Sequence, residues 1–476
     1  MKKIKEQKSQ ALEGTQTGQQ TFGKVSLKEF LRENLALLCI LIGFFLVALS
    51  IGPYHNGDSS WEYDAVSGVL QYGLPYAHGP YLMDQPPLGF YIQAGFFTLF
   101  GSSINDGTFL VTLFGLGCII LVYGIGKMLY NKTTGLFAAL LFAFSPWHLI
   151  MSRTFLIDAQ CLFFSLLSLF VGIVAVRRGS FKLFMASALV FAAAFNTKLY
   201  AVFILVPLIS VLFAAERKNL KRAAGWLAAF SIPVVVASFL WYQTITGVGL
   251  SSIFNHADFL VQAPSGVVPT YFFVGNLLVS YTLGWFFIDA VILSLLVCLV
   301  WRRLFRKFLF LDLMCVATIL CIIGVNMYLG VTLDLKSPYL NAIKYDYQAL
   351  PYFSLLAAGL ITKSVSMLKV RQTRKKLSKI VISAVAVAGL VLAAAALFYN
   401  LSYVHLFTTW DYMIFRVQPG VAYGYSLFNS APISANSILM GAQYVGFAVA
   451  LSGVLWASRQ KIVLSLRRLW RRPPRA

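Results

Sequence analysis

The sequence has few charged residues, and few of these are acids. Asp, Glu, Lys and Arg make up only 12% of its 476 residues, and 17 acids stand against 39 Lys and Arg residues. Hydrophobic residues, by contrast, make up 59%, and many apolar runs reach the length of about 20 residues that a membrane-spanning helix needs. This composition excludes an ordinary water-soluble domain and predicts a polytopic membrane protein.

The sequence also lacks the cysteine spacings of a zinc site or a disulfide framework. Its six Cys residues lie in or beside apolar runs, where they are small buried hydrophobes. No internal repeat is evident, which weakens the reading as a secondary transporter built from two related halves. A polytopic transporter or lipid flippase nevertheless stays open as the alternative function.

The apolar runs predict an all-α integral membrane protein with about twelve transmembrane helices. A transmembrane domain at 35–457 is expected between a basic N-terminal segment at 1–34 and a basic tail at 458–476. Proline steps such as Ser145-Pro146 mark kinks or span ends. The expected spans are Leu35–Ile51, Phe109–Leu129, Gly135–Ile150, Leu156–Val176, Leu183–Phe195, Leu199–Ala214, Ala223–Ile245, Trp285–Trp301, Leu309–Thr332, Ala349–Met367, Ile380–Asn400 and Ile438–Ala457.

The Lys and Arg residues are distributed as in a cell-membrane protein whose N- and C-termini are both cytoplasmic. With twelve spans, all but five of the 39 fall on the inner side, and the bias alternates correctly at every loop. The net charge of +22 is therefore a topology signal, and no nucleic-acid partner is expected. Eleven of the 17 acids fall on the outer side, which predicts an extracytoplasmic site for any carboxylate chemistry.

The first external loop, 52–107, concentrates acids. The stretch Ile51–Gly101 contains no Lys or Arg, and its periodicity predicts interfacial helices at Trp61–Leu70 and Leu88–Phe100. Asp58 is a candidate catalytic base, because a carboxylate at a membrane face can accept a proton from a hydroxyl or amine. The same residue could instead cap the following helix, and spacing alone favours capping.

Three other acids of this loop receive smaller roles. Glu62 follows Asp58 by one helical turn, and Glu62 and Asp64 are interpreted as the solvated start of a helix. Asp84 and Gln85 come directly before two prolines, which fix the backbone and present both side chains rigidly at a helix start.

Five cations on the outer side oppose the general charge bias, so some of them should have a compensating role. Binding an anionic lipid phosphate is the natural one. Arg153 and Asp158 flank a short outer turn. They are expected to form either a local ion pair or a polar patch that faces a cavity. Lys198 stands isolated between two spans, where snorkelling to the interface is the alternative. The five cations are Arg153, Lys198, Lys336, Lys344 and Arg416.

Several of these residues occur in an order that resembles a known family. The chain resembles the polyprenyl-phosphate-sugar-dependent glycosyltransferases of the GT-C fold, in particular the dolichyl-phosphate-mannose protein mannosyltransferase and aminoarabinose (lipid A) transferase group. The matching landmarks run through most of the membrane core. They are Asp58, Leu70, Gly73, Asp84-x-Pro86-Pro87-Leu88, Tyr91, Ser152-Arg153 with Asp158, Thr197-Lys198 and Tyr347-x-x-Leu350-Pro351.

The resemblance implies a GT-C-like bundle that moves a sugar from a polyprenyl-phosphate carrier to a protein, glycolipid or wall-glycan acceptor of the cell envelope. It further implies that Asp58 is the catalytic base, that Asp84 assists it, and that polar residues near the donor phosphate include Arg153 and Lys198. Lys336, Lys344 and Arg416 complete the expected phosphate-binding set. Supporting roles fall to Asp158, Glu62, Gln85 and Tyr347.

The chain departs from the family pattern at two positions. Ser59 stands where the family often has Glu, which keeps a non-catalytic subunit of an envelope assembly as a further hypothesis. Gln85 stands where the aminoarabinose transferases have Lys, so phosphate binding passes to the other outer cations. A divalent cation is an additional hypothesis, with ligands drawn from Asp58, Glu62 or Asp84 together with His55, His78 or His256.

Overall fold

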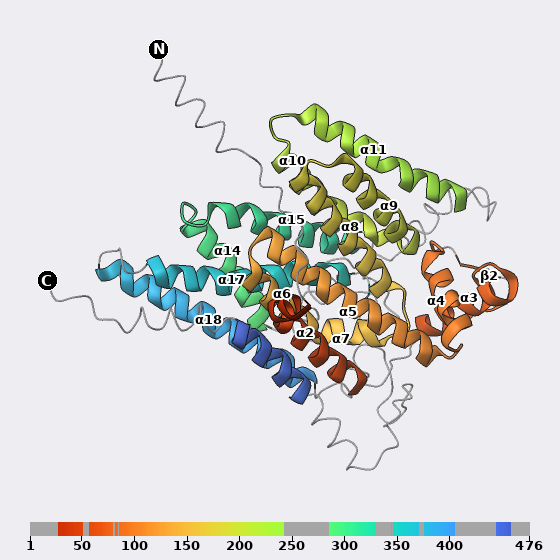
Figure 1. The fold of residues 1–476 in the computed structure, drawn as a ribbon, viewed down its shortest axis with the longest axis horizontal. Coiled ribbons are helices and arrows are strands. Elements are labelled where there is room, and N and C mark those ends of the chain that lie inside the picture. The colour runs from red at the N-terminus through yellow and green to blue at the C-terminus, as the bar shows by residue number, and fades with distance from the viewer. Residues whose placement is uncertain are drawn as a thin grey trace, which may run out of the picture. The chain divides into compact units, whose positions relative to one another are not determined.

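The computed structural model describes residues 27–50, 57–79, 81–83, 85–241, 285–328, 344, 346–370, 376–404 and 444–457. Figure 1 shows how these residues are arranged. The chain divides into two compact units, Met1–Leu35 and Ala36–Ala476. The packing described below belongs to the second unit.

The described residues are mostly helical, and every expected span overlaps one of the helices. The first half contains α2 (Leu27–Ser50), α3 (Gly57–Tyr72), β1 (Tyr76–Ala77), β2 (Tyr81–Leu82), α4 (Leu88–Phe100), α5 (Ile104–Leu129), α6 (Lys132–Ala143), α7 (Pro146–Arg153), α8 (Asp158–Arg178), α9 (Phe181–Thr197), η1 (Leu199–Ile204), α10 (Leu205–Ala215) and α11 (Leu220–Phe239). The second half contains α14 (Trp285–Val300), α15 (Arg306–Tyr328), η5 (Tyr347–Ala349), α17 (Leu350–Val370), α18 (Lys376–Val404) and a last helix at Tyr444–Ala457.

Five of the described helices are long and apolar enough to cross a membrane individually, and a bent pair, α6 with α7, raises the number to six. Seven shorter apolar helices are also described. The chain is therefore a mostly helical, multi-pass membrane protein. The expected total of about twelve spans is not confirmed by the described residues.

The third expected span is not one straight helix. Gly135–Ile150 was predicted as a single span, but α6 ends at Ala143, α7 begins at Pro146, and the two are bent by 60°. Proline has no N–H to continue the helical ladder, and Ser145 before it is extended, with φ −65° and ψ 129°. The proline step therefore breaks the span, as the sequence indicated for Ser145-Pro146.

Helix α17 occupies the centre of the bundle. In its apolar window 83% of the residues are buried, the largest share among the five described spans. It packs against α6, α14, α15 and α18. A helix that is buried all round carries apolar and small residues on every face, as the run Leu355–Leu360 does. The length and composition of α17 are those of a membrane-spanning helix, and the two ends of such a helix lie at opposite membrane faces.

The described residues between α2 and α5 form a small subassembly. Helix α3 packs against α4 and against the antiparallel hairpin of β1 and β2 (Figure 1), which the all-α prediction did not anticipate. A second hydrophobic cluster joins this subassembly to the segment between α7 and α8 through Phe155 and Ile157. The loop is thereby anchored directly beside the start of α8.

Candidate active site

Five charged side chains gather where the first-loop helices meet the ends of the membrane helices. We call this group the acid–lysine cluster. Its members come from the first two turns of α3, the first residue of α8, the residue after α9, and the residues just before η5. They are Asp58, Glu62, Asp158, Lys198 and Lys344.

Asp58 lies in the first turn of α3 and is bound by a lysine that is distant in sequence. Lys344 Nζ donates a hydrogen bond to Asp58 Oδ2 over 2.5 Å. The Lys344 side chain is 7% exposed, whereas that of Asp58 is 38% exposed. Burial acts to raise the pKa of the Asp58 carboxyl, but the attraction of Lys344 and Lys198 outweighs it and holds the pKa below its usual value. Asp58 is therefore an ionised, accessible carboxylate.

The capping interpretation of Asp58 is wrong. The helix was expected to start at Trp61, but α3 begins at Gly57, so Asp58 already lies within its first turn. A carboxylate there still interacts favourably with the helix dipole. The hydrogen bond of its side chain nevertheless goes to Lys344, which leaves the residue available for chemistry.

Asp158 and Lys198 form the buried pair of the cluster. Lys198 Nζ donates to Asp158 Oδ2 over 2.8 Å, and both side chains are 5% exposed. Asp158 opens α8, while Lys198 occupies an extended link, with φ −161° and ψ 140°, between α9 and η1. Lys198 is thus turned into the protein rather than out to the interface, so the snorkelling alternative is wrong.

Glu62 is buried, contrary to the expected solvated helix start. It lies one turn after Asp58 on α3, is 3% exposed, and its Oε2 accepts a hydrogen bond from the Ile157 backbone N–H over 2.8 Å. Burial raises the pKa of the Glu62 carboxyl to about 8, although Lys198 and Lys344 pull it down. At neutral pH Glu62 is therefore mostly protonated, and the cluster holds two ion pairs and one neutral acid.

The proton on Glu62 leads to a pH-dependent stability. The pKa is about 8 in the folded protein against 4.5 for an ordinary glutamate, so between these values the folded state binds a proton that the unfolded state has lost. Stability should therefore fall as pH rises from about 4.5 to about 8. Glu62→Gln, which imitates the protonated acid, should remove this part of the slope in thermal unfolding measured in detergent.

Glu62→Ala is the comparison variant for this experiment. It also removes the titrating group, but it leaves the Ile157 N–H without its acceptor, so it should be less stable than Glu62→Gln at every pH. If the stability of the wild type and that of Glu62→Gln changed equally with pH, a buried, protonated Glu62 would be contradicted.

The start of α4 holds the cluster in place by close packing. A Cβ added at Gly89 would lie 2.7 Å from Ile157 Cγ2, 2.9 Å from Ile157 Cβ and 3.2 Å from Thr197 Cγ2. Ile157 and Thr197 directly precede Asp158 and Lys198. The absence of a side chain at Gly89 therefore allows α4 to pack against the side chains of the two residues that precede the buried pair.

Gly89→Ala should destabilise the protein by about 1–3 kcal/mol, the usual cost of overpacking. Gly95→Ala, on the same helix, is the matched control, because no atom lies within 4 Å of the Cβ it would add. That substitution should stabilise by about 0.5–1 kcal/mol, since alanine is the better helix former. Thermal unfolding should show a lower unfolding temperature than the wild type for Gly89→Ala and a higher one for Gly95→Ala. Equal changes in the two variants would contradict the close packing at Gly89.

Polar side chains behind the cluster make their own contacts. The Tyr347 hydroxyl lies 2.6 Å from His148 Nδ1, so it braces α7 against η5. Arg153 Nη1 donates to Thr112 Oγ1 over 3.2 Å. Gln348, which the sequence did not single out, donates to Cys161 Sγ over 3.1 Å. These contacts join α5, α7, α8 and η5 beneath the cluster.

Several expected site residues lie outside the described residues, namely Asp84, Lys336 and Arg416, together with the expected metal ligands His55 and His256. Among the described residues, no three His, Cys, Asp or Glu side chains gather as a metal site. His78 Nδ1 lies 2.6 Å from Asp64 Oδ2. Of the other expected ligands, Asp58 accepts a hydrogen bond from Lys344, and Glu62 accepts one from the Ile157 backbone N–H. A divalent-cation site that includes Asp84, His55 or His256 stays a prediction, because these three residues lie outside the described ones.

Comparisons with known proteins bear on this arrangement. A family model described as dolichyl-phosphate-mannose-protein mannosyltransferase matches residues 84–242, about a third of the chain. Two proteins of Bacillus subtilis (strain 168) described as candidate mannosyltransferases are also similar: YkcB is 28% identical over 196 residues, and YycA is 27% identical over 232 residues. These matches cover 40% and 46% of this chain but only 26% and 33% of the two relatives.

Among solved structures, the crystal structure of ArnT from Cupriavidus metallidurans bound to undecaprenyl phosphate matches with a TM-score of 0.51 at 14% identity. The match covers 89% of this chain and 77% of that one. The fold is GT-C. The resemblance stated from the sequence motifs is thereby confirmed for the fold. The family match also includes both residues of the buried Asp158–Lys198 pair, whereas Asp58 and Lys344 lie outside it.

Proposed function

We propose that this chain is a membrane glycosyltransferase that transfers a monosaccharide from a polyprenyl-phosphate carrier to a hydroxyl or amine acceptor on the extracytoplasmic side. The observation that carries the proposal is the Asp58–Lys344 pair, an accessible, ionised carboxylate held by a buried lysine. The GT-C fold supports it, as do the lipid phosphate bound to ArnT and the lipid-linked mannose in the family description.

In the proposed reaction, Asp58 acts as the general base. Its carboxylate accepts the proton of the acceptor O–H or N–H while the acceptor atom bonds to the anomeric carbon of the sugar. The bond between that carbon and the phosphate oxygen breaks, and the polyprenyl phosphate leaves with the electron pair. Cations near the departing oxygen stabilise its charge, a role for Lys344, with Lys198 and Arg153 supporting it.

The shared position of Lys344 couples donor binding to base strength. Before the donor binds, Lys344 holds Asp58 ionised. A phosphate that binds Lys344 Nζ competes with Asp58 for the same ammonium group, so the carboxylate loses part of its stabilisation and becomes a stronger base. Asp58 is therefore most basic when the donor is in place.

Other predicted site residues keep their proposed roles. Asp84 assists the base, while Lys336 and Arg416 contribute to phosphate binding. Gln85 Oε1 is buried and has no hydrogen-bond partner among the described residues. An unpaired buried acceptor is costly, so we assign it to a hydroxyl of the transferred sugar.

The test is a transfer assay on membranes that contain the protein. Labelled polyprenyl-phosphate sugars are supplied one at a time, and the label is followed into protein, glycolipid and wall-glycan pools. The proposal expects one donor to label one pool, and no label in membranes that lack the protein. The absence of protein-dependent transfer from every donor would overturn it.

One observation favours a second function, transport. Lys363 on α17 and Asp312 on α15 form an ion pair in which both side chains are fully buried, and ionisable residues at membrane depth often mark a substrate pathway. Protein reconstituted in liposomes separates the two functions, because a transporter moves its substrate without forming a covalent product.

A further inference from the structure

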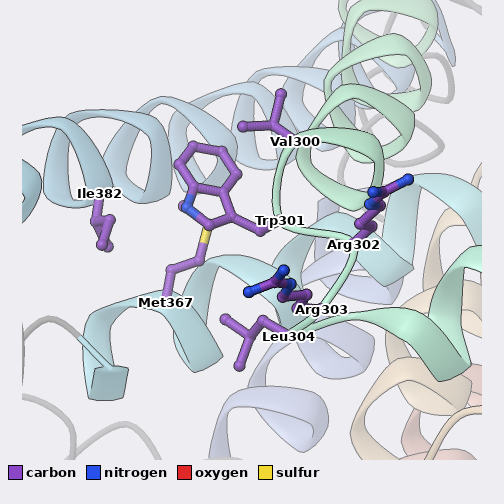
Figure 2. A pocket seen from close by; sticks show the side chains of 7 residues that line it. All are labelled: Val300, Trp301, Arg302, Arg303, Leu304, Met367 and Ile382. Carbon is purple, nitrogen blue, oxygen red and sulfur yellow. The ribbon is translucent and has the colours of Figure 1, made fainter.

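A cavity lies at the turn between α14 and α15. It has a volume of about 240 Å³ and is lined by Val300–Leu304, by Met367 on α17 and by Ile382 on α18. Figure 2 shows these side chains surrounding it from the three segments. None of them belongs to the acid–lysine cluster, so the cavity is a separate feature of the fold.

Two adjacent arginines give the cavity a positive rim. Arg302 and Arg303 are exposed and line the cavity (Figure 2). Among the described residues, no carboxylate lies within ion-pair distance of either guanidinium. Unpaired guanidinium groups beside a cavity favour a ligand with phosphate oxygens, which they can bind through two parallel hydrogen bonds.

The cavity opens onto the apolar surface of the bundle. Leu299 and Val300 near the end of α14, and Ile380 and Val381 in the first turns of α18, are all highly exposed large hydrophobics. In a multi-pass membrane protein such a surface contacts lipid tails. Trp301, at the junction of the apolar surface and the arginines, is a residue type that concentrates at the membrane interface. The lining therefore changes from cationic to apolar, as the ligand of such a site should change from headgroup to tail.

The cavity and the candidate active site lie at opposite ends of α17. The cluster adjoins the N-terminal end of this helix, whereas Met367 lies 17 residues after Leu350, a distance of about 25 Å along the axis at 1.5 Å per residue. If the cluster faces the outside, the cavity faces the cytoplasmic leaflet, which carries the anionic lipids of a membrane.

A buried polar network fixes the walls of the cavity. Lys363, one turn before Met367, donates to Asp312 on α15 and to Ser294 Oγ on α14, the latter over 2.7 Å. The Tyr130 hydroxyl donates to Asp312 Oδ1 over 3.0 Å. The three helices that border the turn are therefore tied together directly behind it, and a site on tied helices is preorganised for its ligand.

We propose that this cavity binds the headgroup of an anionic membrane phospholipid. Arg302 and Arg303 bind its phosphate, Trp301 packs at the level of the headgroup, and the acyl chains lie along the exposed apolar faces of α14 and α18. The site lies on the membrane face opposite the acid–lysine cluster and takes no part in the transfer reaction.

The test measures binding of labelled phosphatidylglycerol and of labelled phosphatidylcholine to the full-length protein in detergent. Phosphatidylglycerol should bind saturably at one site and more tightly than phosphatidylcholine. The double variant Arg302→Gln/Arg303→Gln should weaken phosphatidylglycerol binding about 30-fold, which corresponds to about 1 kcal/mol for each basic residue near the membrane surface. Both side chains are exposed, so the variant is expected to fold.

The matched control is Arg217→Gln/Lys218→Gln, which removes two exposed charges from the turn between α10 and α11. Its phosphatidylglycerol affinity should stay within about twofold of the wild type, the scatter expected for charges that touch no ligand. Equal losses in both double variants, equal affinity for the two lipids, or displacement of the lipid by millimolar inorganic phosphate would each overturn the proposal. The last result would instead identify a site for free phosphate.

Discussion

Replacing Asp58 by Asn should lower the rate of sugar transfer by about 10²- to 10⁴-fold, the usual contribution of a general base. The amide keeps the shape of the side chain but cannot accept the acceptor's proton. The carboxylate of Asp58 is the accessible one of the acid–lysine cluster, and it is ionised before the reaction begins. Initial rates of label transfer from the donor, at saturating donor and acceptor, measure the effect on the chemical step.

Asp64→Asn provides a closely matched control. Asp64 lies on the same helix, its side chain is also 38% exposed, and its Oδ2 has a partner of its own, His78 Nδ1, at 2.6 Å. The substitution removes the same charge, so a general electrostatic effect on the loop would lower the rates of both variants equally. We expect transfer to be retained in Asp64→Asn. Undiminished transfer in Asp58→Asn would instead favour the non-catalytic hypotheses.

A double variant separates catalysis from folding. Asp58→Asn removes the carboxylate that pairs with the Lys344 ammonium, which is 7% exposed, and breaking a buried ion pair from one side destabilises a protein. Asp58→Asn/Lys344→Met removes the ammonium as well and should restore the unfolding temperature. Transfer should be at least as low as in the single variant, because the base is still missing and Lys344 no longer stabilises the departing phosphate.

The helices and part of the site could be predicted from the sequence because both rest on local signals. Runs of apolar residues give the positions of the spans directly, and each expected span overlaps a described helix. Asp158 and Lys198 were selected because a charge in a short connection between spans is unusual. The structure shows that these two residues pair with each other.

Pairing between distant segments could not be predicted in the same way. Lys344 lies 286 residues from Asp58, and no local pattern identifies which of the five outer cations packs against α3. Glu62 looks solvated by its neighbours in sequence, but the packing of α3 against Ile157 buries it. Lys363 and Asp312 were counted with the cytoplasmic charges, although they form a buried pair inside the bundle. Each of these outcomes depends on tertiary packing.

Lys198→Met should destabilise the protein by about 3–5 kcal/mol, the cost of breaking a buried ion pair from one side. It removes the ammonium that pairs with the Asp158 carboxylate, which is 5% exposed and therefore poorly hydrated. The same change removes an attraction that acts on Asp58 and on Glu62. Thermal unfolding in detergent measures the loss relative to the wild type.

The double variant Lys198→Met/Asp158→Asn tests whether the loss comes from the unpaired charge. Replacing both partners of a buried pair by neutral groups is often close to neutral for stability, so the double variant should be more stable than Lys198→Met alone. The interaction energy from this double-mutant cycle belongs to the pair itself. If the stability loss of the double variant equalled the sum of the losses of the two single variants, a direct interaction between Asp158 and Lys198 would be contradicted. Transfer should remain low in the double variant even where stability returns, because the departing phosphate has lost one of the cations that stabilise its charge.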